Sequence, residues 1–371
     1  MRQFGILAIV AALSVGATAV ALRTGTPTIA SDRRGEQVVP GLLDKANGLT
    51  GIVVRQGNDP ITIEKRGSGF AVAETGFPVK TDLVRDLVTG LIELRFEEAR
   101  TNDPARHSEL GVADAGSPGG GKEVTLRSGS SDIANVIVGI GDSTVGSSIG
   151  GVYVRLKGAP QTWLARGSVK LPPTRADWFA NVDLGAKRFE IKKIELSGGD
   201  KDTVTVAPAA DKPGELALEN VPEGRFAETF KVSRLPTFVE SFSFLDVRRR
   251  TAPAANTRRM TVEVDGGLRL VFAGVGEASE GWVQISAEAT ADAKREKATS
   301  ISSSVDAYEF KIPANQAETL GLTMADLTTD QKPEPQAPQM PPGMGMPPGM
   351  GRGMPPGMPP GLPPGFQFQD R

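Results

Sequence analysis

Gly141, Asp142 and Ser143 are residues whose types and spacing could supply a nucleophile in this chain of 371 residues. An apolar run, VIVGI, comes directly before them. A serine hydroxyl is a weak nucleophile at neutral pH, so catalysis requires a general base, almost always a histidine oriented by an acid. The chain holds one histidine, His107, with Asp103 four residues before it.

The stretch resembles the first block of the Gly-Asp-Ser hydrolases, in which a serine leaves a buried strand and attacks an ester carbonyl. In that family the histidine lies near the C-terminus in an Asp-x-x-His block, whereas His107 lies upstream of Ser143. A short motif outside its structural context is only a hypothesis. The runs VIVGI and VYVRLKG flank a glycine-rich stretch, so we predict a β-hairpin with a long loop, and a hydrolase is kept as a remote alternative.

Composition excludes several classes of site. The chain has no cysteine and a single histidine, which excludes thiol catalysis, disulfides and thiolate or multi-histidine zinc sites. Its net charge is -2, so no global basic field exists to hold nucleic acid. We therefore expect no cofactor, no metal centre and no nucleic-acid partner.

Five arginines concentrate positive charge in an otherwise balanced chain. They bracket the segment TAPAANT, which we expect to be a hairpin loop, and such a cluster could meet an anionic headgroup or an acidic partner. A solvated loop is the interpretation that we favour for them. The candidate interaction patch consists of Arg248, Arg249, Arg250, Arg258 and Arg259.

Trp163 and Trp178 flank the segment LARGSVKLPPTRAD. We expect them to lie in the core and at a seam between two domains, because large aromatic side chains dominate core packing.

Both ends of the chain differ from its middle. Residues 4–22 carry no charge and span about 28 Å as a helix, close to the hydrocarbon thickness of a bilayer. We predict a retained transmembrane anchor, and a signal peptide cleaved within residues 17–21 is the rival interpretation. Residues 331–371 are rich in proline, glycine and methionine, so we expect a disordered tail. Its methionine thioethers are soft ligands, which leaves Cu(I) binding as a remote alternative at Met340, Met344, Met346, Met350, Met354 and Met358.

The middle of the chain contains a weak internal repeat, over residues 61–166 and 189–313. Each copy reads as a β-hairpin, one helix and an antiparallel meander. The segment LRFEEAR of the first copy matches FSFLDVR of the second. Pro236 falls early in the second helix, where it is tolerated if Ser233 is the N-cap. The apolar rows of the two helices are Leu83, Leu87 and Leu91, and Leu235, Phe238 and Phe242.

The segment GFAVAETGFPVKTDLVRDLVTGLIELRFEEARTNDPARHSELGV, with YVRLKG, TWLARG and PPTRADWF after it, resembles the domain-of-unknown-function family 4340. The resemblance covers residues 52–312 and is strongest over residues 61–179. It implies a membrane-anchored bacterial protein that faces the periplasm and is often encoded beside ABC transporters of the gliding-motility type. The family has no established catalytic residues, so the resemblance assigns none here.

Together these observations predict an α+β protein with two similar units. The expected parts are an anchor at 4–22, a linker at 23–50, units at 51–180 and 181–330, and a tail at 331–371. The expected function is that of a non-enzymatic accessory or scaffold protein of an ABC transport or envelope system, single-pass in the inner membrane and largely periplasmic. A periplasmic ligand-binding module is the alternative, which predicts one concave apolar pocket with converging polar groups.

Overall fold

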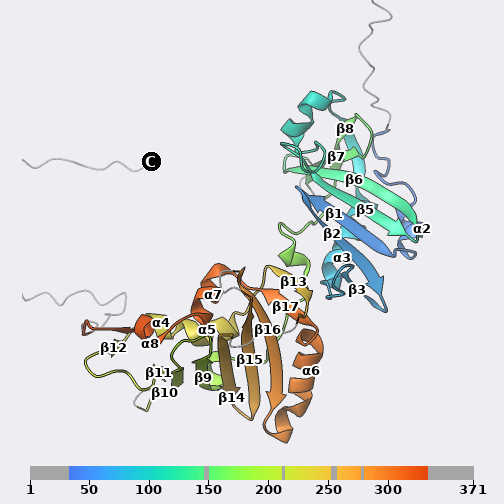
Figure 1. Cartoon of the computed structure of the whole chain (residues 1–371). Coiled ribbons are helices and arrows are strands. Elements are labelled where there is room, and N and C mark those ends of the chain that lie inside the picture. The colour runs from blue at the N-terminus through green and yellow to red at the C-terminus, as the bar shows by residue number, and fades with distance from the viewer. Residues whose placement is uncertain (1–32, 146–149, 211–213, 252–256, 277–279, 333–371) are drawn as a thin grey trace, which may run out of the picture. The chain divides into compact units, whose positions relative to one another are not determined.

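The computed structural model describes residues 33–145, 150–210, 214–251, 257–276 and 280–332. Two eight-stranded sheets make up most of it, and all pairs of neighbouring strands within them run antiparallel (Figure 1). The protein is therefore α+β, as predicted. The predicted anchor lies outside the described residues, as does the tail beyond residue 332.

The first sheet has the order β3-β2-β1-β5-β6-β7-β8-β4. Its strands are β1 Gly51–Gln56, β2 Asp59–Arg66, β3 Gly69–Val72, β4 Arg95–Ala99, β5 Lys122–Ser128, β6 Ser131–Asp142, β7 Gly151–Leu156 and β8 Thr162–Arg166. The first strand pairs with both β2 and β5, so it lies inside the sheet. A β-hairpin was expected before the helix, and the sheet instead begins with three antiparallel strands.

The second sheet has the order β11-β10-β9-β14-β15-β16-β17-β13. Its strands are β9 Ile191–Ser197, β10 Val204–Pro208, β11 Leu216–Leu218, β13 Asp246–Arg249, β14 Arg259–Val264, β15 Leu268–Val275, β16 Trp282–Ala289 and β17 Tyr308–Lys311. When the strands of each sheet are numbered along the chain, the two orders correspond position by position. In both sheets the fourth strand lies at an edge and follows a helix.

Helix α3, Thr81–Glu93, forms because its apolar residues recur at helical spacing, and it buries Val84, Leu87 and Leu91. Leu83, expected in the buried row, is only partly buried against the core. Gly90 allows the segment at Ser168 to pass close to α3, because a Cβ at this position would lie 2.6 Å from the carbonyl oxygen of Ser168.

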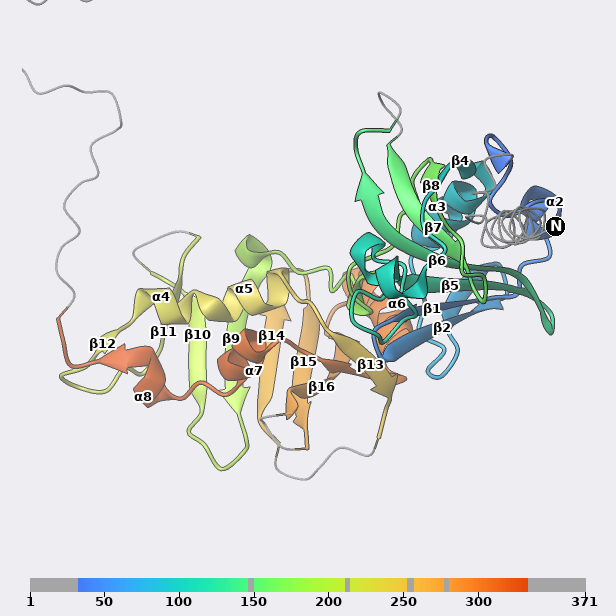
Figure 2. The same cartoon turned by 90° about the horizontal axis from the view of Figure 1, so that it is seen from above.

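Helix α5, Arg234–Glu240, occupies the matching place in the second sheet and lies across its strands (Figure 2). Leu235 and Phe238 are buried in it, as expected, but Phe242 follows the end of the helix. Ser233 stands at the N-cap position, yet its hydroxyl donates to the carbonyl of Phe230 and accepts no hydrogen bond from the helix amides. The capping role predicted for Ser233 was therefore wrong.

The remaining helices are short. They are α2 Leu42–Ala46, α4 Thr229–Val232, α6 Arg295–Val305, α7 Ala314–Leu320 and α8 Met324–Leu327. The sequence reading missed α6, which lies between β16 and β17 and packs against β15 and β16. No helix occupies the matching position between β7 and β8 in the first sheet.

Part of the expected linker belongs to the first sheet. Gly35 and Val38 donate backbone hydrogen bonds to Phe96 and Leu94, and Phe96 donates to the carbonyl of Glu36, at 2.8 to 3.0 Å. Residues 35–38 therefore extend along the outer edge of β4. Apolar side chains that follow are buried in the core, including Leu42 at 1% exposure.

The two tryptophans lie in the interior, as predicted. Trp163, on β8, contacts the ring of Phe96 at 4.6 Å between centroids, and Trp178 is 2% exposed. The aromatic contacts between residues of the two halves involve Phe77 and Phe179 instead. Phe77 contacts the rings of Phe244, Tyr308 and Phe310 at 5.0 to 5.7 Å, and Phe179 stacks on Phe244 at 5.7 Å.

Candidate functional site

The Gly-Asp-Ser stretch is a turn between paired strands. Asp142 is the last residue of β6, and β6 pairs with β7 antiparallel, which confirms the predicted hairpin. The Oδ1 atom of Asp142 accepts hydrogen bonds from the amide and hydroxyl of Thr144 at 2.9 and 2.6 Å, and Oδ2 accepts from the Tyr153 hydroxyl at 3.0 Å. These bonds, led by those from Thr144, lower the pKa of Asp142. Ser143 lies exposed in the turn.

His107 is buried in the 3-10 helix η2, Pro104–Leu110. Its Nε2 atom lies 2.8 Å from the carbonyl oxygen of Pro160, and a carbonyl can only accept, so Nε2 carries the proton and donates. The imidazole thus ties η2 to the turn before β8. It lines an open cleft of about 530 Å³ together with Asp114, Arg155 and Lys157.

A buried arginine organises the floor of this cleft. Arg155, 6% exposed, donates to the carbonyls of Val112 and Ala159 at 2.8 and 3.2 Å and to Asp114 at 2.5 Å. The hydrogen bond from Arg155 is the main reason that the pKa of Asp114 is lowered. All the nitrogens of the guanidinium therefore bond to neighbouring groups, which fasten the segment after η2 to the sheet.

Lys157 extends the same ionic network. Its ammonium lies 3.0 Å from Glu123 and 3.4 Å from Asp114, and the hydrogen bond to Glu123 is the largest cause of its raised pKa. Glu123 is 7% exposed although it lies on the face of β5 opposite the apolar core. On this face the ionic network lies beside buried apolar side chains, because Glu123 is paired across the strands with Ile137, which is 0% exposed.

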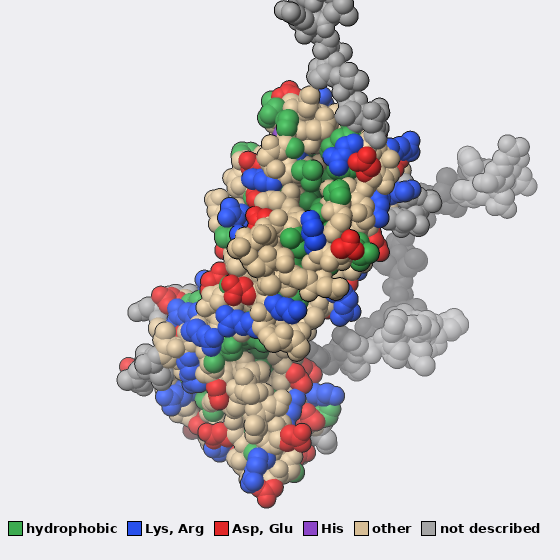
Figure 3. All heavy atoms as spheres, turned by 90° about the vertical axis from the view of Figure 1, so that its right-hand side faces the viewer, with side chains coloured by type: hydrophobic (Ala, Val, Ile, Leu, Met, Phe, Trp, Pro, Cys, Tyr) green, Lys and Arg blue, Asp and Glu red, His purple; other side chains and the backbone are tan. Residues whose placement is uncertain are grey.

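The five arginines of the candidate patch do not bracket a hairpin. Arg248 and Arg249 belong to β13, at an edge of the second sheet, whereas Arg259 begins β14. Three strands, β15, β16 and β17, separate β13 from β14 in the sheet, so the hairpin prediction was wrong. The face seen in Figure 3 carries lysine and arginine side chains interspersed with acidic ones.

The arginines also differ in how exposed their guanidinium groups are and in how many hydrogen bonds they already make. Arg258 donates to the carbonyls of Gly198, Asp202 and Leu322 at 2.5 to 3.3 Å, and burial lowers its pKa. Arg249 and Arg259 are exposed, and Arg249 lies over the ring of Tyr308 at 5.2 Å. A partner would therefore meet Arg249 and Arg259 more readily than Arg258.

Arg248 and Arg250 surround a buried carboxylate that the sequence reading missed. Glu309, on β17, is 0% exposed. Its Oε2 atom accepts from Arg248 Nε at 2.7 Å, and Oε1 accepts from the Thr251 amide and hydroxyl and from Gln284 at 2.6 to 2.8 Å. Arg250 in turn donates to Gln284 Oε1 at 2.9 Å.

Two opposing effects set the charge of this carboxylate. Burial raises the pKa of Glu309, but the hydrogen bonds from Thr251, Gln284 and Arg248 outweigh burial and bring the pKa to about 2. The Arg248 guanidinium also lies over the Trp282 ring at 4.1 Å, which covers the network on one side. The local sequence around Glu309 gives no sign of this network, because its donors Arg248, Thr251 and Gln284 come from other segments.

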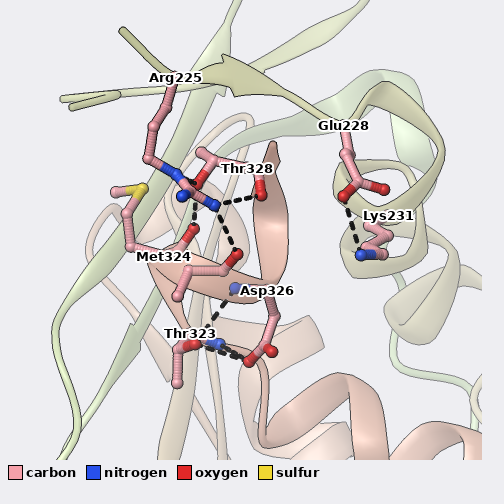
Figure 4. A network of polar contacts seen from close by, with 8 residues as sticks. Arg225, Glu228, Lys231, Thr323, Met324, Asp326 and Thr328 are labelled. Atoms are coloured by element: carbon pink, nitrogen blue, oxygen red, sulfur yellow. Dashed lines mark hydrogen bonds and ion pairs between the residues drawn. The ribbon is translucent and has the colours of Figure 1, made fainter. Parts of the chain in front are cut away.

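A second polar network closes the end of the described chain. Arg225 donates to the hydroxyl and carbonyl of Thr328, both at 2.6 Å, and to the carbonyl of Ala325 at 3.2 Å (Figure 4). Thr323 and Asp326 cap α8 reciprocally, and the hydrogen bonds from Thr323 lower the pKa of Asp326. These contacts hold β18, Thr328–Thr329, against β12, Phe226–Ala227.

The predicted anchor and the methionines of the tail lie outside the described residues. Within the ranges that the structure covers, no helix has the length and apolar character needed to cross a bilayer. The same ranges contain no group of three or more histidine, cysteine, aspartate or glutamate residues arranged to hold a metal ion.

Comparison with known proteins places the chain in a family. No curated protein and no solved structure matches it. One family model, described as a domain of unknown function (DUF4340), matches residues 71–263, from within β3 to within β14. The match is shorter at both ends than the expected 52–312, and it confirms the resemblance carried by the first copy. The chain therefore belongs to the DUF4340 family.

Proposed function

We propose that this chain is a non-enzymatic accessory or scaffold protein of an ABC transport or envelope system. In this proposal residues 4–22 anchor it in the inner membrane and the remainder lies in the periplasm. The observation that supports this role most is that the buried polar side chains are occupied in holding the fold together. The clusters around Arg155, Glu309 and Arg225 spend their hydrogen bonds on fixing loops and strand ends to the sheets.

The proposal includes an internal repeat, in which the two sheets are copies of one unit. Its support is the corresponding strand order, with a helix before the fourth strand in both sheets. A duplicated sheet gives a scaffold protein two similar surfaces, each of which can carry different inserted segments. Helix α6, between β16 and β17, has no counterpart among residues 157–161, which join β7 and β8 in the first copy.

Purification of the full-length protein from membranes tests the accessory role. We expect subunits of an ABC transporter or an envelope complex to co-purify in fixed stoichiometry, as measured by quantitative mass spectrometry. Reversing two of the three exposed arginines, R249E with R259E, should reduce this recovery because, unlike Arg250, they are not held by hydrogen bonds to Asp306 and Gln284. Recovery of the chain alone from gently solubilised membranes would contradict the proposal.

Intact-mass measurement tests the anchor separately. A retained anchor predicts the mass of the whole chain, 39.0 kDa, in the membrane fraction. A mature chain that starts at Val20 or Leu22 would show that the segment is a cleaved signal peptide.

A further inference from the structure

A second cleft of the first sheet has the composition of a ligand site. It has a volume of about 410 Å³ and lies beside the irregularity in the pairing of β6 with β7, where the register shifts between Val138 and Gly141. Apolar side chains of Val138, Val152 and Val169 line it, together with backbone at several glycines. This volume falls within the range of sites that hold small organic ligands.

Lys122 supplies the charge of the cleft. Its ammonium donates to the carbonyls of Leu171 and Pro172 at 3.3 and 2.8 Å, and burial lowers its pKa. The charge of Asp177 opposes this effect of burial, but no carboxylate in the described part of the chain lies within ion-pair distance of the Lys122 ammonium. An ammonium has three donors, so one N–H is left beyond those two carbonyls for a further acceptor. A partly desolvated cation beside apolar walls favours an anionic group with an apolar body.

The glycines of the cleft fall into two kinds. At Gly139 a Cβ would lie 2.4 Å from the carbonyl oxygen of Leu110, and at Gly121 it would lie 2.5 Å from that of Gly111. Those two glycines are required by close backbone packing. At Gly141 the nearest atom to such a Cβ is 3.9 Å away, so a side chain there has room. Gly141 also lines the cleft, which makes it the position at which the cleft can be filled.

We propose that this cleft binds an aliphatic carboxylate, with the carboxylate on Lys122 and the aliphatic part against Val138, Val152 and Val169. A single lysine among carbonyls and apolar side chains matches one negative charge better than a phosphate of higher charge. The same chemistry is offered by a free short-chain acid and by the C-terminus of a polypeptide that ends in an apolar residue. This binding role goes beyond the scaffold function and does not depend on the membrane anchor.

Saturation-transfer NMR with the full-length protein tests the site, using hexanoate and its uncharged amide as probes. We expect hexanoate to bind and the amide to bind about tenfold more weakly, since a charge-assisted hydrogen bond is lost. A peptide that ends in leucine, with a free or an amidated C-terminus, forms the second arm. Stronger binding of the free peptide than of hexanoate identifies a polypeptide C-terminus as the source, and the reverse identifies a small acid.

Three variants connect the binding to this cleft. K122M should weaken hexanoate binding about tenfold without affecting the amide, and G141L should weaken both by filling the cleft. K192M is the matched control, because Lys192 is an exposed lysine on β9 of the second sheet, where it pairs with Asp265. Circular dichroism verifies that each variant is folded. Absence of hexanoate binding to the wild-type protein, or equal affinities for wild type, K122M and folded G141L, would overturn the proposal.

Discussion

Glu309 carries a full negative charge without exposed surface because donors surround both of its oxygens. The carboxylate is bonded by Arg248, Thr251 and Gln284, and Arg250 orients Gln284 from behind. Removing one member of such a network leaves the others buried and unsatisfied, which costs more than the lost bond itself. The network therefore fixes the edge strand β13 and the turn after it to β16 and β17.

Replacement of Glu309 by glutamine tests this account. E309Q should lower the free energy of unfolding by about 2 to 4 kcal/mol at pH 7, because the Arg248 charge loses its partner. The folded-state pKa of Glu309, about 2, lies below its ordinary 4.5, so its contribution is complete above pH 4.5 and is lost as the pH falls through 2. Urea titrations between pH 7 and 2 should show the difference between wild type and E309Q shrinking over that lower range.

A matched control separates this effect from general acid denaturation. Glu195 pairs with Lys193 on the partly exposed surface of the same sheet, at 3.0 Å. E195Q should change the free energy of unfolding by less than about 0.5 kcal/mol at either pH. An E309Q difference that persists unchanged at pH 2 would contradict the role of the ionised carboxylate.

Ser143 should be dispensable. Its neighbour Asp142 is bonded to Thr144 and Tyr153, and the single histidine of the chain donates to the Pro160 carbonyl. A fluorophosphonate probe should leave the serine unlabelled, and S143A should alter the free energy of unfolding by less than about 0.5 kcal/mol. Stoichiometric labelling that disappears in S143A would restore the hydrolase alternative.

At the scale of elements, alternation and helical spacing predicted most strands and both main helices, because each buries one face. The same signals could not give strand order. The runs around TAPAANT resembled a hairpin, yet β13 takes an edge beside β17 while β14 pairs with β9 and β15. Strands that follow one another along the chain are usually neighbours in a sheet, and only tertiary pairing distinguishes the two arrangements.

Helix α6 and the buried networks were missed for related reasons. The helix REKATSISSSV is rich in serine, and its buried residues are only Ala298, Ile301 and Val305. Glu123 and Glu309 occupy positions that alternation assigns to solvent, but other segments cover them. Burial of a polar residue depends on distant partners, which local sequence does not contain.

Truncation of one leucine in each main helix tests whether the two copies are stabilised alike. Leu87 and Leu235 are both 0% exposed, so L87A and L235A should each lower the free energy of unfolding by about 2 to 5 kcal/mol. Thermal and urea denaturation measure the loss. L43A is the control, because Leu43 on α2 is 63% exposed and its removal creates no cavity. A loss confined to one of the two leucine variants would argue against equivalent roles of α3 and α5.

At the scale of the whole molecule, the compact unit ends at Asp330. Truncations after and before this residue should therefore affect stability differently. Removing residues 331–371 should leave the melting temperature unchanged, because the Arg225 network and the buried Leu327 remain. Removing residues 323–371 also deletes α8 and β18, which should cost about 2 to 4 kcal/mol from lost apolar burial and hydrogen bonds. Differential scanning calorimetry distinguishes the two, and equal melting temperatures would contradict this assignment.

If the preceding segment is anchored in a membrane, the backbone pairing of residues 35–38 with β4 bears mechanical load. Any tension between the bilayer and the protein then reaches the folded unit first at β4, where Arg33 and Arg34 contact Phe96 and Glu97 and where Gly35 and Glu36 are hydrogen-bonded to Phe96. A short antiparallel pair at a sheet edge separates one bond at a time under such a load. Breaking this pairing would lengthen the tether by a few residues, while the buried Leu42 still holds the chain. The hydrogen bonds within the sheet would therefore break only at a higher load.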